Sequence, residues 1–534
     1  MPEYRLASSI ALSALVLKYT FSSLSELKIR GIANSARDIY RFSVRKFFKL
    51  LMTYVPNIKK QVNEELETAL QKLEVDMVDQ GRELISHVEL PNVGLSETEV
   101  KKELEIMANM HHSAWEEGKV SGAVYHGGEE LLRLQAEAYG MFSVSNQLHP
   151  DVFPGVRKME SEIVSMVLKM FNGPETGCGT TTSGGTESLL MACLSAKMKA
   201  YHERGVVHPE IIAPVTIHAG FDKAAYYFDM TLRHAPVDPV TFQVDLGAVK
   251  RLVNSNTVLI AGSAPNFPHG IIDDIEGLSR ISLRYKIPLH VDACLGSFVV
   301  PFLQRAYAEI DPSVVVPLFD FRVLGVTSIS CDTHKYGFAP KGSSVIMYRS
   351  PELRRYQYFL ATDWSGGIYA SPTLAGSRPG ALMAGCWASL VRIGVQGYLD
   401  SCKNIVSAAK HIKEQIETID GLVVVGNPIS SVVAFTSTTL NVYDISDKLT
   451  AKGWHLSALQ NPAAIHIACT RLTVAAAENL ITDLRESVEA VAESGSSRAD
   501  QGDTAMLYGV AGSISTNGLV DELAVGFLDN LYKV

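Results

Sequence analysis

The chain has 534 residues, a net charge of −9, 47% apolar residues and 20% charged residues. This length accommodates two or three domains with a large core, and the acidic balance argues against a general nucleic-acid binder, which is usually basic. The seven cysteines are scattered without a CxxC pair, which favours reduced thiols over a disulfide framework or a zinc site.

The first 60 residues carry two candidate membrane segments. The apolar run 6–17 ("LASSIALSALVL") is shorter than the roughly 20 residues that span a bilayer, so a shortened anchor, a signal-like segment and a buried helix all stay open. Residues 39–55 alternate basic and aromatic side chains, which predicts a helix on an anionic membrane surface; the alternative is a helix that docks on its own protein. We expect residues 1–60 to be membrane-associated.

A short helical segment follows at residues 61–130. Residues 60–80 read as a charged helix, and Pro91 and Gly94 break that pattern. A second helix is predicted from Ser96 to about residue 117, because "SETE" has the spacing of a capping box. The adjacent pair His111 and His112 is rejected as a metal site, since neighbouring residues on a helix point in different directions.

Helical and strand-like patterns alternate through residues 131–385, the predicted large domain. Such alternation predicts an α/β fold with a mostly parallel sheet covered by helices on both faces. Residues 386–534 mix a long helical pattern with short apolar runs and are predicted to form a smaller α+β domain. The helices expected are 158–171, 186–204 and 399–419, and the strands expected are 210–216, 257–264, 288–293, 343–348, 422–426 and 431–437.

Lys335 stands in "CDTHKYG" (331–337), between His334 and Tyr336, just after a strand-like run. A lysine amine forms a Schiff base with an aldehyde, and pyridoxal 5'-phosphate (PLP) is the aldehyde cofactor that uses this bond most widely. A PLP site also needs a phosphate cradle, an acidic partner for the pyridine nitrogen and a group that lies against the ring.

Candidates for these three parts follow earlier strand-like runs. Residues 181–188 ("TTSGGTES") place two glycines before a helix start, where free N–H groups attract an anion, although such a turn is often only a tight loop. Asp292 ends a strand-like run, where α/β folds bind ligands, but a lone aspartate there is often a cap. His218 offers a flat imidazole that can lie against the pyridine ring, although a lone histidine is usually an ordinary polar residue. Their order along the chain predicts a PLP enzyme with an aspartate-aminotransferase-like fold, fold type I.

The chain resembles the sphingosine-1-phosphate lyases, a branch of the group II PLP-dependent decarboxylase family, from about residue 90 to the C-terminus. The Thr-His-Lys segment marks the wider superfamily, and "ASPTLAGSRPG" and "APKGSS" point to the lyase branch. The other motifs that carry the resemblance are "SGAVYHGG", "HPDVFPGVRKMESEIV", "TSGGTESLLMAC", "PLHVDACLGSF", "TDWSGG" and "YGVAGSI".

The resemblance implies a role for each matching residue. Lys335 is the Schiff-base lysine, Asp292 the pyridine partner and His218 the stacking residue. The residues that line the substrate end are Tyr125, Asn146, His149 and Lys341. His334 touches the cofactor, and its phosphate is held by Gly184, Gly185 and Thr186. Gly376 and Ser377 complete that cradle from the partner subunit of a homodimer.

The implied reaction is cleavage of the C2–C3 bond of a phosphorylated sphingoid base by a retro-aldol step, giving a long-chain aldehyde and phosphoethanolamine. Tyr125, His149 and Lys335 all stay open as the base. Lys341 suits the substrate phosphate as a point charge, or is a plain turn lysine. An amino-acid decarboxylase on the same fold is the second hypothesis. A membrane-bound interaction protein is the third, and the intact Lys335 counts against it.

Two features depart from the family pattern. The family usually has Asn-Pro where this chain has Asn146-Gln147, so we expect a freer loop around His149. The family also usually carries a clear membrane anchor near its N-terminus, and the run at 6–17 is short for one. The resemblance implies an endoplasmic reticulum membrane location with the catalytic part facing the cytosol, since basic flanks lie on that side.

Overall fold

The computed structural model describes residues 56–78, 81, 84–494 and 517–534, so the predicted membrane segments at 6–17 and 39–55 lie outside the described residues. The chain divides into two compact units, residues 1–113 with 497–534 and residues 114–496. The predicted boundaries at residues 60, 130 and 385 do not coincide with the limits of these units. Within the described part of the chain, no helix is long and apolar enough to cross a membrane.

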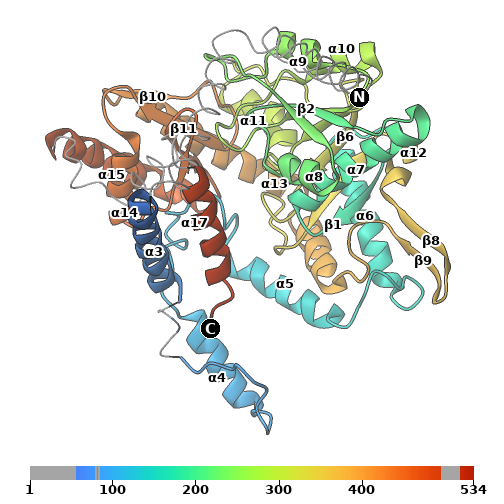
Figure 1. The fold of residues 1–534 in the computed structure, drawn as a ribbon, viewed down its shortest axis with the longest axis horizontal. Coiled ribbons are helices and arrows are strands. Elements are labelled where there is room, and N and C mark those ends of the chain that lie inside the picture. Colours follow the sequence, from blue (N-terminus) through green and yellow to red (C-terminus); the bar gives the residue numbers. More distant parts are fainter. Residues whose placement is uncertain (1–55, 79–80, 82–83, 495–516) are drawn as a thin grey trace, which may run out of the picture. The chain divides into compact units, whose positions relative to one another are not determined.

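The described part of the first unit contains α3 (Pro56–Val78), α4 (Glu97–Ala108) and α17 (Asn517–Asn530), and α3 packs against α17 (Figure 1). The predicted capping box of α4 is confirmed. The Glu99 amide donates to Ser96 Oγ (3.3 Å), and the Ser96 amide donates to Glu99 Oε2 (2.7 Å). This helix ends at Ala108, earlier than predicted.

A seven-stranded sheet forms the centre of the second unit, in the order β1-β7-β6-β5-β4-β2-β3. Only β7 runs antiparallel to its neighbours, which confirms the predicted mostly parallel sheet. Every residue of β2, β4, β5 and β7 is buried, as expected for strands covered on both faces. The strands are β1 (Cys178–Thr182), β2 (Glu210–Pro214), β3 (Thr231–Ala235), β4 (Thr257–Ser263), β5 (Leu289–Asp292), β6 (Val326–Cys331) and β7 (Ser344–Tyr348).

Helices surround this sheet, and α7, which is buried along most of its length, packs against β4, β6 and β7 (Figure 1). It ends at Gly205, whose φ of 66° is the left-handed conformation that stops a helix. The surrounding elements are α5 (Glu129–Phe142), α6 (Pro154–Met170), α7 (Gly185–Arg204), α8 (Gly220–Tyr227), α9 (Leu246–Leu252), α10 (Ile275–Tyr285), η2 (Val300–Phe302), α11 (Leu303–Ile310), α12 (Pro351–Arg354) and η3 (Arg355–Gln357).

A smaller antiparallel sheet, in the order β10-β11-β13-β12, confirms the α+β pattern expected toward the C-terminus. The helix α13 (Gly380–Ile416) leads into it from the large sheet and bends at Gly394, where φ is 64°. The predicted boundary at residue 385 falls inside this helix. The remaining elements are β8 (Phe359–Trp364), β9 (Gly367–Ser371), β10 (Leu422–Val424), β11 (Val432–Ser437), α14 (Val442–Ala451), β12 (Ser457–Leu459), β13 (Ala464–Ala468) and α15 (Thr473–Ser494).

The strand order fixes where the predicted site residues lie. Strands β1, β2, β5 and β6 run in one direction, so their carboxyl ends meet at a single edge of the sheet. The Gly184–Gly185 turn follows β1, His218 follows β2, Asp292 ends β5 and Lys335 follows β6. That edge is where open α/β sheets bind ligands.

Candidate active site

The turn that carries Lys335 is held firmly from several directions. The Ser343 amide donates to His334 Nδ1 (3.1 Å), and the Tyr336 hydroxyl donates to the carbonyl of Cys469 (2.7 Å). Tyr336 is itself 1% exposed. A lysine on such an anchored turn has little freedom beyond its own side chain, which suits a residue that must present its amine at one place.

The amine of Lys335 forms an ion pair that sequence reasoning missed. Lys335 Nζ lies 3.0 Å from Asp332 Oδ2, and His334 Nε2 lies 3.6 Å from the same oxygen. Burial opposes the charge of Lys335, but the Asp332 carboxylate outweighs it and raises the pKa of the amine. Burial also opposes the charge of Asp332, yet Lys335 and His334 lower its pKa. Both members of the pair are therefore charged at neutral pH.

Asp332 also shapes the neighbouring glycine turn. It is 1% exposed, and its Oδ1 has no hydrogen-bond partner within the described residues. A Cβ at Gly185 would lie 2.8 Å from both carboxylate oxygens, closer than real Cβ atoms approach. Only glycine fits at that position. The signal for Asp332 was its place three residues before the lysine in "CDTHKYG", which reads as a polar turn until the fold is known.

The predicted phosphate cradle opens α7. Gly184 is the N-cap and Gly185 the first helical residue, and the first turn of a helix leaves its N–H groups without helical partners. Ser183 donates through its amide (2.7 Å) and its hydroxyl (2.6 Å) to Glu187 Oε2. The Ser183 donors are therefore engaged, whereas Gly184, Gly185 and Thr186 are partly accessible.

Asp292, the predicted pyridine partner, is buried at the end of β5. It is 6% exposed, and its Oδ1 accepts the amide of Cys294 (3.0 Å) and the Ser330 hydroxyl (3.4 Å). Cys294 is buried among Asp292, Asp332 and Lys335; burial first, and then the two carboxylates, raise the pKa of its thiol. The structure thus brings the predicted carboxylate and lysine together around one buried thiol.

His218 lies exposed after β2. Its Nδ1 accepts the amide of Gly220 (2.9 Å), which places the proton of the neutral ring on Nε2. The predicted stacking residue is thus held in one orientation.

Tyr125 and Lys341 lie beside the lysine turn, at the predicted substrate end. Lys341 Nζ lies 4.7 Å from the centre of the Tyr125 ring and donates to the carbonyl of His334 (3.5 Å). Burial raises the pKa of Tyr125, although the charge of Lys335 acts against that rise. Burial, and then the neighbouring Lys335 charge, lower the pKa of Lys341. The phenol is therefore uncharged at neutral pH beside two cationic side chains.

Asn146 and His149 belong to a loop that rests on the strap 372–379. Asn146 Oδ1 accepts the amides of Arg378 (3.1 Å) and Leu148 (2.9 Å), and its Nδ2 donates to Ser377 Oγ (3.0 Å). His149 is exposed, and its amide donates to the carbonyl of Asn146 (3.2 Å). Within one subunit the structure therefore places Ser377 on Asn146 and brings neither His149 nor Ser377 into contact with Lys335.

Gln147 makes hydrogen bonds at the position where the family usually has proline, and the expected freedom of the loop stays a prediction. The Gln147 amide donates to the carbonyl of Arg378 (3.3 Å), a bond that proline cannot make. The Gln147 side chain is 8% exposed, and its Nε2 donates to Thr181 Oγ1 (3.4 Å).

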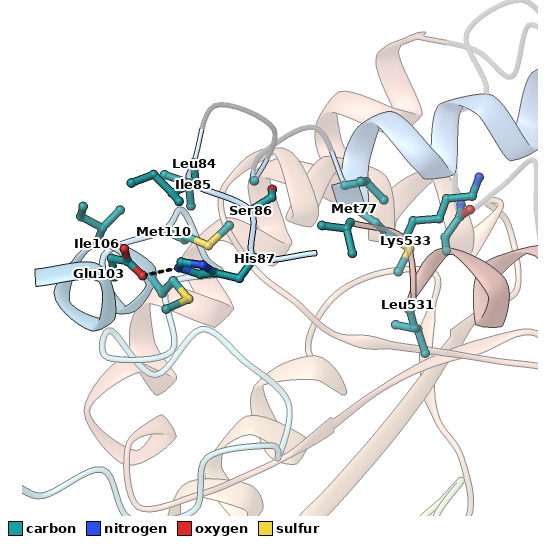
Figure 2. Close-up of a pocket in the computed structure, with 15 residues that line it drawn as sticks. Met77, Leu84, Ile85, Ser86, His87, Glu103, Ile106, Met110, Leu531 and Lys533 are labelled. Atoms are coloured by element: carbon teal, nitrogen blue, oxygen red, sulfur yellow. Dashed lines mark hydrogen bonds and ion pairs between the residues drawn. The ribbon is translucent and has the colours of Figure 1, made fainter. Parts of the chain in front are cut away.

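A separate hollow of about 500 Å³ lies among the described residues of the first unit (Figure 2). Its lining is largely apolar, with Leu84, Ile85 and Met110 among the side chains around the 2.8 Å contact of His87 with Glu103. None of the predicted site residues lines it, so it is not the candidate active site.

The residues at the sheet edge fit PLP. They supply an amine on an anchored turn, a buried carboxylate at the adjoining strand end, an exposed imidazole and a glycine cradle at a helix start. A Cβ at Gly185 would meet both carboxylate oxygens of Asp332, which shows how closely the cradle and the lysine turn are packed together.

Comparison with known proteins gives consistent matches. The profile of the pyridoxal-dependent decarboxylase conserved domain matches residues 85–438. The sphingosine-1-phosphate lyase of Saccharomyces cerevisiae is 55% identical over 95% of this chain and 86% of its own, and that of Drosophila melanogaster is 42% identical over 93% and 90%. Among solved structures, the Burkholderia pseudomallei sphingosine-1-phosphate lyase superposes with a TM-score of 0.74 at 40% identity, over 78% of this chain and 96% of its own.

A more distant structure shares the fold alone. Glutamate decarboxylase of Lactobacillus brevis superposes with a TM-score of 0.66 at 20% identity, covering 78% of this chain and 97% of its own. These likenesses agree with the predicted fold type I architecture.

Proposed function

We infer the function from family membership: the chain belongs to the pyridoxal-dependent decarboxylase family and, within it, to the sphingosine-1-phosphate lyases. It is a PLP-dependent lyase that cleaves the C2–C3 bond of phosphorylated sphingoid bases in sphingolipid breakdown. The products are a long-chain aldehyde and phosphoethanolamine. The observation that carries the assignment to this site is the Lys335–Asp332 pair beside Asp292, at the ends of adjoining strands.

In this proposal each site residue binds one part of the cofactor. Lys335 would hold the aldehyde carbon covalently, Asp292 would keep the pyridine nitrogen protonated, and His218 would lie against the ring. Gly184, Gly185 and Thr186 hold the phosphate, with His334 beside it. When bound, the cofactor withdraws the electrons that are released at C2 of the substrate.

The protonation states suggest how the three candidate bases divide their roles. Asp332 holds a free Lys335 amine as an ammonium, and Tyr125 is uncharged, so both side chains suit donation of a proton. His149 is the remaining candidate, and histidine is the side chain that most often serves as a general base. We assign removal of the C3 hydroxyl proton to His149, delivered by the loop that Asn146 anchors.

The substrate phosphate finds a cationic partner in Lys341. Its ammonium lies close enough to Lys335 for the two positive charges to oppose each other. A phosphate dianion relieves that repulsion, whereas a neutral head group does not. This charge preference favours a phosphorylated substrate over its unphosphorylated counterpart.

The active unit in this proposal is a homodimer with shared sites. The β8–β9 hairpin, which comes directly before the strap, carries several exposed apolar side chains, including Trp364 at 58% and Ile368 at 80% exposure. Exposed apolar patches of this kind mark protein contacts. A partner packed on the hairpin would bring its Gly376 and Ser377 to the cofactor phosphate.

The proposed location is the endoplasmic reticulum membrane, with the catalytic part in the cytosol. The basic and aromatic side chains of residues 39–55 support membrane association. All seven cysteines are free thiols, which suits a reducing compartment. Flotation of the full chain with vesicles containing anionic lipid tests the association, and a chain that stays at the bottom of the gradient would contradict it.

Substrate competition tests the assigned activity. Holoenzyme is offered a sphingoid base phosphate, its unphosphorylated base and aromatic amino acids, and the products are measured by mass spectrometry. Aldehyde from the phosphorylated lipid alone supports the proposal. Carbon dioxide from an amino acid, with no aldehyde, would instead establish an amino-acid decarboxylase.

A further inference from the structure

The loop that carries His149 and the strap 372–379, which are far apart in the sequence, are joined by hydrogen bonds near the site. Besides the bonds of Asn146 to Arg378 and Ser377, the Gly380 amide donates to the carbonyl of Ser145 (3.1 Å). The loop that carries His149 and the strap that carries Ser377 therefore cannot move independently.

A largely buried ion pair fixes the loop and the strap to the body of the subunit. Arg378 Nη1 lies 2.6 Å from Glu160 Oε1, and the two side chains are 12% and 18% exposed. The Thr181 hydroxyl donates to the same carboxylate (2.6 Å) and accepts from Gln147 Nε2 (3.4 Å). Glu160 lies on α6 and Thr181 on β1, so both anchor points belong to rigid elements.

The position of Arg378, and with it that of the loop and the strap, depends on the carboxylate of Glu160. Arg378 Nε is buried without a hydrogen-bond partner in the described residues, and the guanidinium pairs with Glu160 through Nη1. Removing one member of a buried ion pair leaves the other uncompensated, which strongly disfavours the original geometry. Without the carboxylate, Arg378 is expected to leave its seat and to shift both the loop and the strap.

We propose that Asn146, Glu160, Thr181 and Arg378 form a clamp that positions the His149 loop and the Ser377 strap together and thereby couples the two active sites of the dimer. The second half of this statement rests on the proposed function, in which His149 serves the site of its own subunit and Ser377 the site of its partner. Glu160 is then a positioning residue for substrate in one site and for cofactor in the other.

Mixed dimers of the full chain separate the effect on the substrate in one site from the effect on the cofactor in the other. One subunit carries Lys335→Ala, so that absorbance of covalently bound cofactor and turnover both report on the other, intact site. Glu160→Gln is placed either in the Lys335→Ala subunit or in the subunit that keeps Lys335. The dissociation constant of PLP is obtained by titrating the apo-dimer, and KM is measured with a sphingoid base phosphate.

The two arrangements have different expected results. With Glu160→Gln in the Lys335→Ala subunit, the PLP dissociation constant of the intact site rises about tenfold, within the usual range of coupling between sites, and KM stays unchanged. With Glu160→Gln in the subunit that keeps Lys335, KM rises and kcat falls because His149 is displaced, and the PLP dissociation constant stays unchanged. Glu130→Gln is the control, because Glu130 also pairs with an arginine, Arg392, but does so in solvent.

The remaining outcomes overturn separate parts of the account. Wild-type values in both arrangements, with folded protein, would refute the clamp. Both effects confined to the subunit that keeps Lys335 would leave the clamp intact and refute the strap's role in the partner's site. Thr181→Val provides a milder variant if Glu160→Gln does not fold, and it should shift the same two constants in the same directions by a smaller factor.

Discussion

Lys335 Nζ lies 3.0 Å from the carboxylate of Asp332, a buried residue three positions earlier in the same turn. This contact means that the amine that must react is held as an ammonium when it is free. The lysine is thereby positioned for the cofactor, and it can return a proton when substrate displaces it. The predictions below start from this pair.

Replacing Asp332 with Asn should shift cofactor capture to lower pH. Asp332 raises the pKa of Lys335, whereas burial lowers it, so the lysine of the variant becomes a neutral, reactive amine at lower pH. The rate of PLP binding to the apo-protein, followed by absorbance across pH, should show a midpoint below that of the wild type. An unmoved midpoint would contradict the assigned pair.

The same substitution should destabilise the apo-protein by about 3 kcal/mol, because it leaves a mostly buried ammonium without its partner. Asp332 has a lowered pKa and Lys335 a raised one, so the pair contributes throughout the neutral range. Its contribution declines as pH falls through the pKa of Asp332 or rises through that of Lys335. Urea denaturation at pH 7 measures the loss, with the surface variant Glu97→Gln as a control, since Glu97 pairs with Lys101 in solvent.

Gly185→Ala should weaken cofactor binding at least tenfold, since its Cβ would lie 2.8 Å from both oxygens of Asp332 and must displace the lysine turn or the cradle. PLP titration of the apo-protein measures the change. Gly140→Ala is the matched control, because a Cβ at Gly140 meets open space on α5 and should leave PLP binding unchanged. Equal affinities in the two variants would show that the cradle is wrongly placed.

Tyr125→Phe should lower kcat by about a hundredfold, the usual contribution of a general acid or base, while PLP binds normally. The variant keeps the ring beneath Lys341 and loses only the buried hydroxyl. Because burial raises the pKa of this phenol, an alkaline fall in kcat that depends on Tyr125 should lie above the usual range of tyrosine and should vanish in the variant. The exposed Tyr139→Phe controls for loss of a phenol. Normal turnover in Tyr125→Phe would remove Tyr125 from the chemistry.

Trp364→Glu should shift the dimer toward monomer, because it places a charge in the apolar patch of the β8–β9 hairpin. Sedimentation velocity over a range of concentrations measures the shift, and turnover should fall in parallel. Val240→Glu is the control, since Val240 is 77% exposed and is not part of the hairpin. An unchanged dimer in the Trp364 variant would place the interface elsewhere.

Much of the fold follows from local patterns in the sequence. The apolar runs that form β4, β5 and β7 are short and bounded by turns. Gly205 ends α7 and the capping box of Ser96 begins α4, and both do so through local backbone chemistry. The site order was predictable because strand ends in a parallel sheet share one edge.

Other features depend on contacts between distant segments. Asp332 looks like a turn residue until the fold places its carboxylate against Lys335 and Gly185. Gln147 makes hydrogen bonds to residues that lie far from it in the sequence. The helix α13 continues across the predicted boundary at residue 385, because Gly394 bends it without ending it.

The most direct test is to incubate wild-type holoenzyme and its Lys335→Ala variant with a sphingoid base phosphate and to quantify the products by mass spectrometry. The account predicts equal amounts of long-chain aldehyde and phosphoethanolamine from the wild type, and neither product nor covalently bound cofactor in the variant. Product from the Lys335→Ala variant, or a wild type that binds PLP but releases no aldehyde, would contradict it.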